Sequence, residues 1–178
     1  MMQMRKTGAL IFLIGFMLIV YGSPAFGQEL PVSMQAKLML KIAAMDRNTG
    51  RYGDPVKIGV TTDEMLLELN ALSETRINGR SFDAEKMNST DDVEGFKLLY
   101  IGANWKDDYQ EVSSMAERNQ NLIFAAEEEY CVRMGAGVAF KMVDGKPKIV
   151  VNLDAVKKQG ADFPANFLKV TVVVGGLN

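Results

Sequence analysis

The stretch FKLLYIGANWKDDYQEVSSMAERNQNLIFAA, residues 96–126, decides the fold class. Its two ends, Phe96–Ile101 and Asn121–Ala126, are short and almost wholly apolar, which is typical of strands covered on both faces of a sheet. The segment Asp107–Asn119 between them predicts a helix whose first turn holds acidic residues, where they suit the helix dipole. A strand, a helix and a second strand in this order predict two parallel strands joined by a crossover helix.

The same order precedes this stretch. Residues 56–60 alternate apolar with polar or small side chains and predict another strand. The next four residues have the form of a capping box, with Thr61 as the N-cap and Glu64 as its partner, and predict the start of a helix. An Asn78-Gly79 turn then leads into a short extended piece, Arg80–Phe82.

Residues 32–45 predict a further helix that has little solvated face. Its apolar residues recur at helical spacing, and only Lys37 and Lys41, one turn apart, mark a polar edge. A helix of this kind is buried within its own domain or against a partner. Both interpretations stay open at this point.

The last third of the chain changes character. Val138–Val143 and Lys148–Leu153 flank the dipeptide Asp144-Gly145, which is a strong signal for an antiparallel hairpin. Residues 154–159 predict a short helix that Gly160 closes.

The final segment, residues 163–174, is ambiguous. Pro164 at a first helical position, followed by Phe167 and Leu168, favours a helix, whereas the valine-rich tail favours a strand. We favour the helix. The elements together predict an α/β fold: a single-domain three-layer sandwich with a mostly parallel sheet and a C-terminal antiparallel hairpin.

Residues 1–27 have the composition of a cleavable signal peptide. Two basic residues precede an apolar run, Gly8–Tyr21, of about 14 residues, which is shorter than the ~20 needed to span a bilayer. Small residues then precede a cleavage site between Gly27 and Gln28. The alternative is an uncleaved N-terminal anchor. We expect cleavage, which leaves residues 28–178 as one exported α/β domain without membrane insertion after processing.

Charge and cysteine content narrow the classes of partner. The leader holds two of the 20 basic residues and none of the 22 acidic ones, so the processed chain has a formal net charge of −4. A mildly acidic chain without a basic run is not expected to bind nucleic acid. Its single cysteine, Cys131, cannot form an internal disulfide, so it is buried, free, or bonded to a second chain.

The sequence contains no histidine, which argues against an enzyme. Ser-His-Asp and Cys-His catalysis and the usual zinc, copper and non-haem iron sites all need imidazole. Two acidic groups remain: Asp107-Asp108 is explained by its helix start, and residues 127–129 are interpreted as a solvated turn, with contact to a cation or a basic partner as the alternative. We therefore predict no catalytic residue, no metal ligand and no cofactor.

Four residues follow two of the predicted parallel strands. Thr61 and Thr62 come after the strand at residues 56–60, and Asn104 and Trp105 come after the strand at Phe96–Ile101. Open α/β sheets bind ligands outside the carboxyl ends of their strands. These four residues are the candidate ligand-binding group, although a single tryptophan also serves simply to pack.

Short motifs along almost the whole processed chain resemble one family. They are KIGV (57–60), INGR (77–80), LLYIG (98–102), GAGVAF (135–140), the turn at 144–145, IVVNLDA (149–155) and the segment 160–170. In these motifs the chain resembles the YfiR-like family of small exported bacterial proteins. It departs from the family at Asp46-Arg47-Asn48, where members often carry an aromatic residue and Trp-Pro, and in having one cysteine where the namesake has pairs.

The resemblance implies a periplasmic, often dimeric α/β protein that acts in signalling. The family's namesake represses a membrane-bound diguanylate cyclase by engaging its periplasmic sensor domain. We therefore expect a non-enzymatic regulator whose partners are the periplasmic domain of an inner-membrane sensor and a second copy of itself. The alternative is a stand-alone periplasmic protein that binds a small ligand.

Overall fold

A computed structural model describes residues 29–176, apart from the side chains of residues 131 and 132. The expected signal peptide and its cleavage site lie outside the described residues. The described chain forms a seven-stranded sheet in the order β2-β1-β3-β4-β5-β6-β7. The strands are β1 (Val56–Val60), β2 (Phe82–Lys86), β3 (Leu98–Ile101), β4 (Leu122–Ala125), β5 (Val138–Val143), β6 (Lys146–Asn152) and β7 (Val172–Val174).

Strands β1 to β5 run parallel to one another, and β5 and β6 form the predicted antiparallel hairpin. The turn residues Asp144 and Gly145 both have positive φ, 50° and 70°, as the tight turns that suit twisted strands require. After the hairpin, β7 adds one more strand, parallel to β6. The predicted α/β class with a mostly parallel sheet is confirmed.

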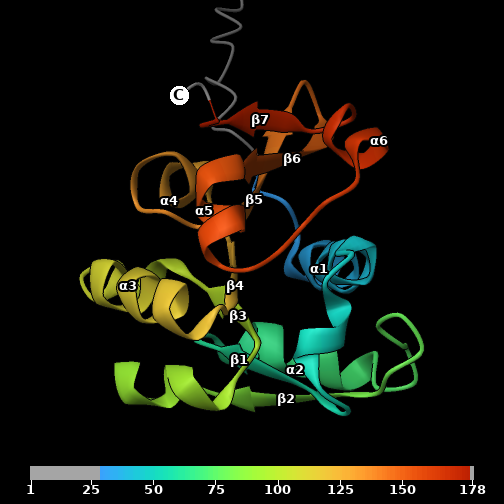
Figure 1. Ribbon diagram of the computed structural model, residues 1–178, viewed down its shortest axis with the longest axis vertical. Coiled ribbons are helices and arrows are strands. Elements are labelled where there is room, and N and C mark those ends of the chain that lie inside the picture. The colour runs from blue at the N-terminus through green and yellow to red at the C-terminus, as the bar shows by residue number, and fades with distance from the viewer. Residues whose placement is uncertain (1–28, 177–178) are drawn as a thin grey trace, which may run out of the picture.

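Helices cover both faces of the sheet, which gives the predicted three layers (Figure 1). One hydrophobic cluster packs α1 (Val32–Met45), α2 (Asp63–Ala71) and α6 (Ala165–Leu168) against one face. The other cluster packs α3 (Tyr109–Asn119), α4 (Glu128–Arg133) and the 3-10 helix η2 (Thr90–Gly95) against the opposite face. The shorter helices α5 (Leu153–Lys158), η1 (Thr49–Tyr52) and η3 (Ala103–Trp105) lie in the connections.

Helix α1 has the predicted bounds, and its burial decides between the two interpretations left open. Its buried residues are Gln35, Ala36, Met39, Leu40, Ile42 and Ala43. They belong to the chain's own core rather than to a surface that awaits a partner. Of its large apolar residues, only Met34 and Met45, one near each end, keep a large part of their surface exposed.

Three local predictions are wrong. The N-cap of α2 is Thr62, whose hydroxyl accepts a hydrogen bond from the backbone N–H of Met65, and not Thr61. Strand β2 begins at Phe82, where the predicted extended piece ends. Its polar sequence, FDAEK, suits an edge strand that is half exposed, and for that reason lacks the apolar signal of the inner strands.

The third error concerns residues 127–129, which were expected to form a solvated turn. They lead into helix α4, with Glu127 as its N-cap residue. The helix forms because Tyr130 is buried in the core and stacks on Tyr109, with ring centroids 4.8 Å apart. The ambiguous last segment contains both alternatives, the one-turn helix α6 and the strand β7.

Candidate functional site

The strand order places the predicted ligand-binding residues at a special position in the sheet. The chain goes from β1 to one edge to form β2, and then returns to form β3 on the other side of β1. Ligands of open α/β sheets bind at such a switch point, outside the carboxyl ends of the strands. Thr61 and Thr62 directly follow β1, and Asn104 and Trp105 lie in η3, just after β3.

Hydrogen bonds connect Thr61 with the loop after β3. The Thr61 hydroxyl accepts a bond from the backbone N–H of Gly102, at 2.8 Å, and donates one to Oδ1 of Asn104, at 3.1 Å. The Asn104 amide donates to the backbone carbonyl of Thr61, at 2.7 Å. Thr61 is fully buried, so its polar groups join the two loops to each other rather than face solvent.

Thr62 belongs to the same junction through its methyl group. A Cβ atom added at Gly102 would lie 2.5 Å from Cγ2 of Thr62 and 2.9 Å from Oδ1 of Asn104. Glycine is therefore needed here because the two loops approach closely. The structure thus brings Thr61, Thr62 and Asn104 together around Gly102.

Trp105 has a different environment from the other three residues. Its half-buried ring packs against the hydrophobic cluster on the α3 face of the sheet. Packing accounts for this contact, as it does for most buried tryptophans. The fourth predicted residue therefore lies at the switch point without joining the hydrogen-bonded group.

Two cavities lie at the carboxyl end of the sheet, farther along it. One, of about 190 Å³, lies between residues 126–128 after β4, residues 140–142 of β5, and Glu29 and Leu30. The other, of about 340 Å³, lies between residues 29–31, Met34 and the β5–β6 hairpin.

Sequence reasoning missed these two cavities because they depend on strand register. The pairing of β4 with β5 ends at Ala125 and Ala139, so Phe140–Val143 extends beyond β4. Residues 29–31, more than 90 positions earlier in the chain, lie beside this extension. No local sequence signal brings these segments together.

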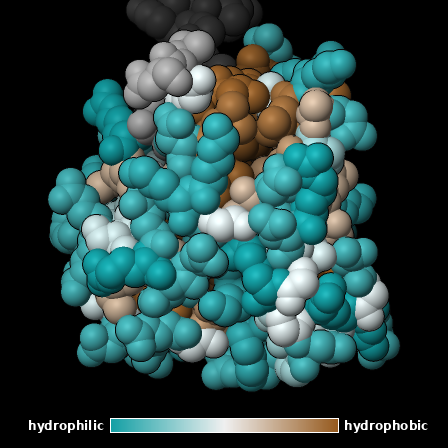
Figure 2. Space-filling model, in the orientation of Figure 1, coloured by the Kyte–Doolittle hydropathy of each residue, from teal (hydrophilic) through white to brown (hydrophobic). Residues whose placement is uncertain are grey.

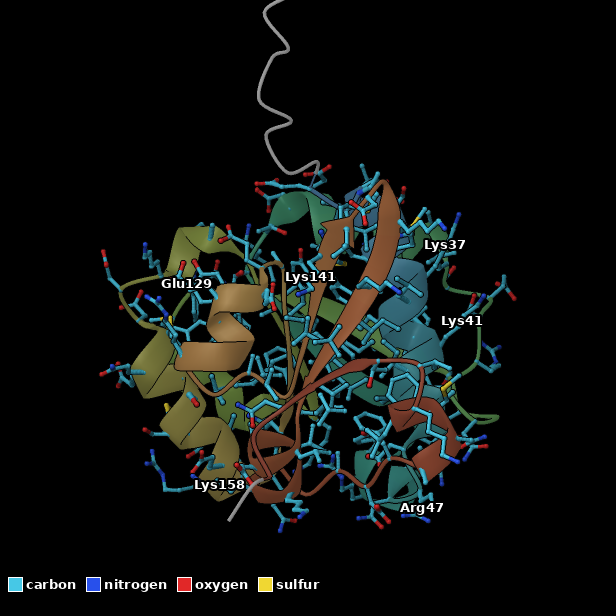
Figure 3. The ribbon with its side chains drawn as sticks, turned by 90° about the horizontal axis from the view of Figure 1, so that it is seen from above. Lys37, Lys41, Arg47, Glu129, Lys141 and Lys158 are labelled. Atoms are coloured by element: carbon cyan, nitrogen blue, oxygen red, sulfur yellow. The ribbon has the colours of Figure 1, made fainter. Side chains whose placement is uncertain are left out.

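The carboxyl end of the sheet is rich in acidic groups. Burial raises the pKa of Tyr100 above its ordinary value, and the negative charges of Glu64, Glu29 and Glu127 raise it further. The Tyr100 hydroxyl donates to Oε1 of Gln35, at 2.9 Å, which links β3 to α1. Figure 3 shows Glu129 and Lys141 at this end of the molecule and Arg47 and Lys158 at the opposite end.

In the described part of the chain, the other reactive or charged side chains near this end of the sheet do not form a further site. Nζ of Lys141 forms an ion pair with Oε1 of Glu128, at 2.7 Å, and both residues line the smaller cavity. Cys131 lies in α4, and its side chain is outside the part of the chain that the structure describes. Among residues 29–176, no three acidic or thiol side chains form a group able to hold a metal ion, and no helix is long and apolar enough to cross a membrane.

Solved structures share this architecture. A conserved domain protein from Vibrio cholerae O1 biovar eltor matches with a TM-score of 0.54 at 17% identity, over 80% of this chain and 60% of that one. The ABC domain from Streptococcus pneumoniae, solved in complex with L-Trp, matches with a TM-score of 0.56 at 12% identity, over 78% of this chain and 62% of that one. This chain thus spans about three fifths of each neighbour, and the likeness shows the α/β fold.

Sequence comparison gives a more specific result. No curated protein matches the chain significantly. The family model described as YfiR/HmsC-like, however, matches residues 33–171, from the first turn of α1 to the residue before β7. The match includes most of both hydrophobic clusters, the switch point and the antiparallel hairpin. The chain therefore belongs to the YfiR/HmsC-like family.

Proposed function

We propose that this chain is a periplasmic regulatory protein that modulates a membrane-bound sensor, such as a diguanylate cyclase or a sensor kinase, by binding its extracytoplasmic domain. The observation that carries the proposal is the family match over residues 33–171, because the YfiR-like family suggests a periplasmic regulator of signalling. In this proposal the protein acts by contact and catalyses no reaction. The absence of histidine from the whole sequence supports that part.

The composition of residues 1–27 supports the location. A basic start, a short apolar run and small residues before position 28 are the features of a leader that is removed during export. We propose cleavage between Gly27 and Gln28 and release of the processed chain into the periplasm.

We further propose that the processed chain is a homodimer. Cys131, the single cysteine, is one candidate for joining the copies through an intermolecular disulfide. Electrophoresis of the periplasmic fraction with and without reductant tests that link. A dimer band that disappears on reduction, and is missing from Cys131→Ser, supports it, and a monomer band under both conditions contradicts it.

Capture from membranes tests the proposed partner. A photo-crosslinking residue is placed in the processed chain at Leu67 on α2 or at Met34 on α1, two exposed apolar positions on different elements. We expect irradiation with membranes of the encoding bacterium to link at least one probe to a protein that has a periplasmic sensor domain. An excess of unlabelled chain should compete as a control. If neither probe captures such a protein, the proposal is contradicted.

A genetic test shows whether the protein activates or represses the sensor. Deleting the gene should change the output of the sensor, measured as cyclic di-GMP content or kinase phosphorylation. The full chain should restore it, whereas a chain without residues 2–27 should not, because it stays in the cytoplasm. Restoration by the leaderless chain would contradict a periplasmic role.

A second candidate function is that of a stand-alone protein that binds a small ligand. The position of Thr61, Thr62, Asn104 and Trp105 at the switch point favours it, since ligands of open α/β sheets bind there. The test is a screen of small metabolites, amino acids included, for a rise in melting temperature and a change in Trp105 fluorescence. Asn104→Ala should weaken any hit, and a screen without a hit would contradict this candidate.

A further inference from the structure

The two edges of the sheet have opposite chemistry. At one edge β2 carries Asp83, Glu85 and Lys86, and Lys57 of β1 forms ion pairs with Asp83 and Glu85. Charged side chains of this kind keep an edge strand from pairing with another chain. At the other edge, residues 170–176, which include β7, have the uncharged sequence VTVVVGG without proline. This edge strand is short, but residues 170–176 carry neither the charged side chains nor the proline that commonly protect an edge.

The unprotected edge is also apolar and exposed. Val170 is 73% exposed and Val173 is 41% exposed, which places both among the most exposed large apolar residues of the described chain. Figure 2 shows hydrophobic surface gathered where β7 and the β5–β6 hairpin lie in Figure 1. An exposed apolar edge strand is a site for pairing with another strand.

The backbone groups of Val173 point away from the sheet. The N–H of Asn152 donates to the carbonyl of Gly137, at 2.9 Å, so Asn152 faces β5. The backbone N–H and C=O groups of successive residues point alternately to the two neighbouring strands, so those of Val151 point to β7. The register partner of Val151 on β7 is Val173. In a parallel ladder Val151 then bonds to the residues on either side of Val173, which leaves the N–H and C=O of Val173 directed outward.

We propose that β7 of a second copy pairs antiparallel with this edge, around a two-fold axis at Val173. This inference rests on the homodimer proposed above and names its interface. In an antiparallel pair centred on Val173, each copy gives its outward N–H to the C=O of the other, which is the self-complementary contact that a two-fold dimer requires. The two sheets become one continuous sheet, and no charged residue of either β7 is buried.

The charges that flank β7 fit a second copy in the same antiparallel orientation. Asp154 lies at the end of β7, where its Oδ2 accepts a hydrogen bond from the backbone N–H of Gly176, at 2.9 Å. Lys169 precedes β7, is exposed, and forms none of the ion pairs within residues 29–176; Asp154 also forms none. Lys169 is the C-cap residue of α6, three positions before β7, and an antiparallel pair of β7 strands places this end of one copy beside the Gly176 end of the other. The dimer thus has two equivalent contacts, and in each one Lys169 of one copy lies near Asp154 of the other.

Engineered cysteines test this register. In a Cys131→Ser background, Val173→Cys should form a covalent dimer under mild oxidation, because a residue opposite itself in a hydrogen-bonded pair has its Cα atom about 5.5 Å from its mate. Thr171→Cys is the matched control. In the same register it lies opposite residue 175, roughly 14 Å along the strand from its own mate at about 3.4 Å per residue, and should stay monomeric in the gel.

Val173→Pro tests the contact without a crosslink. Proline removes the outward N–H and is tolerated on an edge strand, so β7 should still pair with β6. We expect the mass of the variant measured by light scattering to fall to half that of the wild type, with an unchanged circular dichroism spectrum. Lys169→Asp, which places two acidic groups together, should also weaken the dimer, and adding Asp154→Lys should restore it.

The outcomes separate this inference from the proposed function. A dimeric wild type whose Val173→Pro variant keeps its mass, or whose Val173→Cys and Thr171→Cys variants crosslink equally, overturns the β7 interface and leaves the homodimer and the sensor binding standing. A wild type that is monomeric at every concentration overturns the interface together with the homodimer. Capture of the membrane sensor is measured independently of both.

Discussion

At the scale of the residue, Asp46 is a side chain whose importance the sequence does not reveal. It lies in a polar stretch, yet it is 2% exposed. Its Oδ1 accepts bonds from the backbone N–H groups of Asn48 and Asp162, at 2.9 and 2.8 Å. Its Oδ2 accepts from the Tyr52 hydroxyl, at 2.5 Å, and from Arg51, at 3.3 Å. One carboxylate therefore joins the end of α1, η1 and the loop before α6.

We expect Asp46→Ala to lower the free energy of unfolding by about 3 kcal/mol, because it leaves several buried donors without an acceptor. Urea denaturation followed by circular dichroism measures the change. Arg47→Ala is the control: its ion pair with Asp162, at 2.7 Å, is exposed and should contribute less than about 1 kcal/mol. Equal losses in the two variants would contradict a special role for the buried carboxylate.

Tyr100 predicts a dependence of stability on pH. Its pKa is raised in the folded protein, first by burial and then by Glu64, Glu29 and Glu127. The neutral phenol thus stabilises the fold fully below the unfolded pKa of about 10, and this contribution is lost as the pH rises through the higher folded value. The free energy of unfolding should therefore decline above pH ~10.

The variant Tyr100→Phe should flatten that alkaline decline and cost about 1 kcal/mol at pH 7, where the hydrogen bond to Gln35 is lost. Denaturation curves collected from pH 7 to pH 11 provide the measurement. Burial also raises the pKa of Tyr52, so Tyr52→Phe should flatten the decline as well. A Tyr100→Phe protein with the slope of the wild type would show that this phenol does not contribute.

At the scale of the element, the contact between the loops after β1 and β3 depends on Gly102. Gly102→Ala forces Cβ against Thr62 and Asn104, so we expect a loss of about 2 kcal/mol in thermal or urea unfolding. Gly50→Ala in η1 is the matched control, since no atom lies within 4 Å of its added Cβ and its φ is not in the left-handed region. A loss of similar size in both variants would contradict the steric explanation.

Elements with strong internal periodicity were predictable, and elements that depend on distant contacts were not. The bounds of α1 follow from its apolar spacing, and those of β5 follow from the turn beside it. By contrast, β2 is polar because it is an edge, and α4 forms because Tyr130 reaches Tyr109. In the last segment, the preference for helix stops at Leu168, and the valines after it find a partner in β6.

The candidate site divides in the same way. The carboxyl ends of two strands put Thr61, Thr62 and Asn104 close together, which the order of elements was enough to predict. The sequence could not predict that the polar groups of Thr61 form hydrogen bonds within the protein and are buried. Nor could it predict the cavities beside Leu30 and Phe140. Both depend on the register between strands, and register is set by the packed core as a whole.

At the scale of the whole molecule, the sheet has one charged edge, β2, and one uncharged edge, β7. The proposed dimer therefore predicts that thermal stability depends on protein concentration. If the uncharged edge pairs with a second copy, mass action stabilises the folded dimer as the protein concentration rises. For the processed chain, residues 28–178, we expect the melting temperature to rise by about 2 °C for each tenfold increase in concentration. Differential scanning calorimetry over two decades of concentration measures this slope.

The Val173→Pro variant should lose the slope while its melting temperature approaches that of the wild type at the lowest concentration, because the β6–β7 ladder remains intact. Leu67→Lys is the control, since it removes an exposed apolar side chain far from this edge and should keep the slope. A flat response in the wild type would mean that the exposed valines of β7 stay uncovered. A slope shared by the wild type and Val173→Pro would place the contact between copies on another surface.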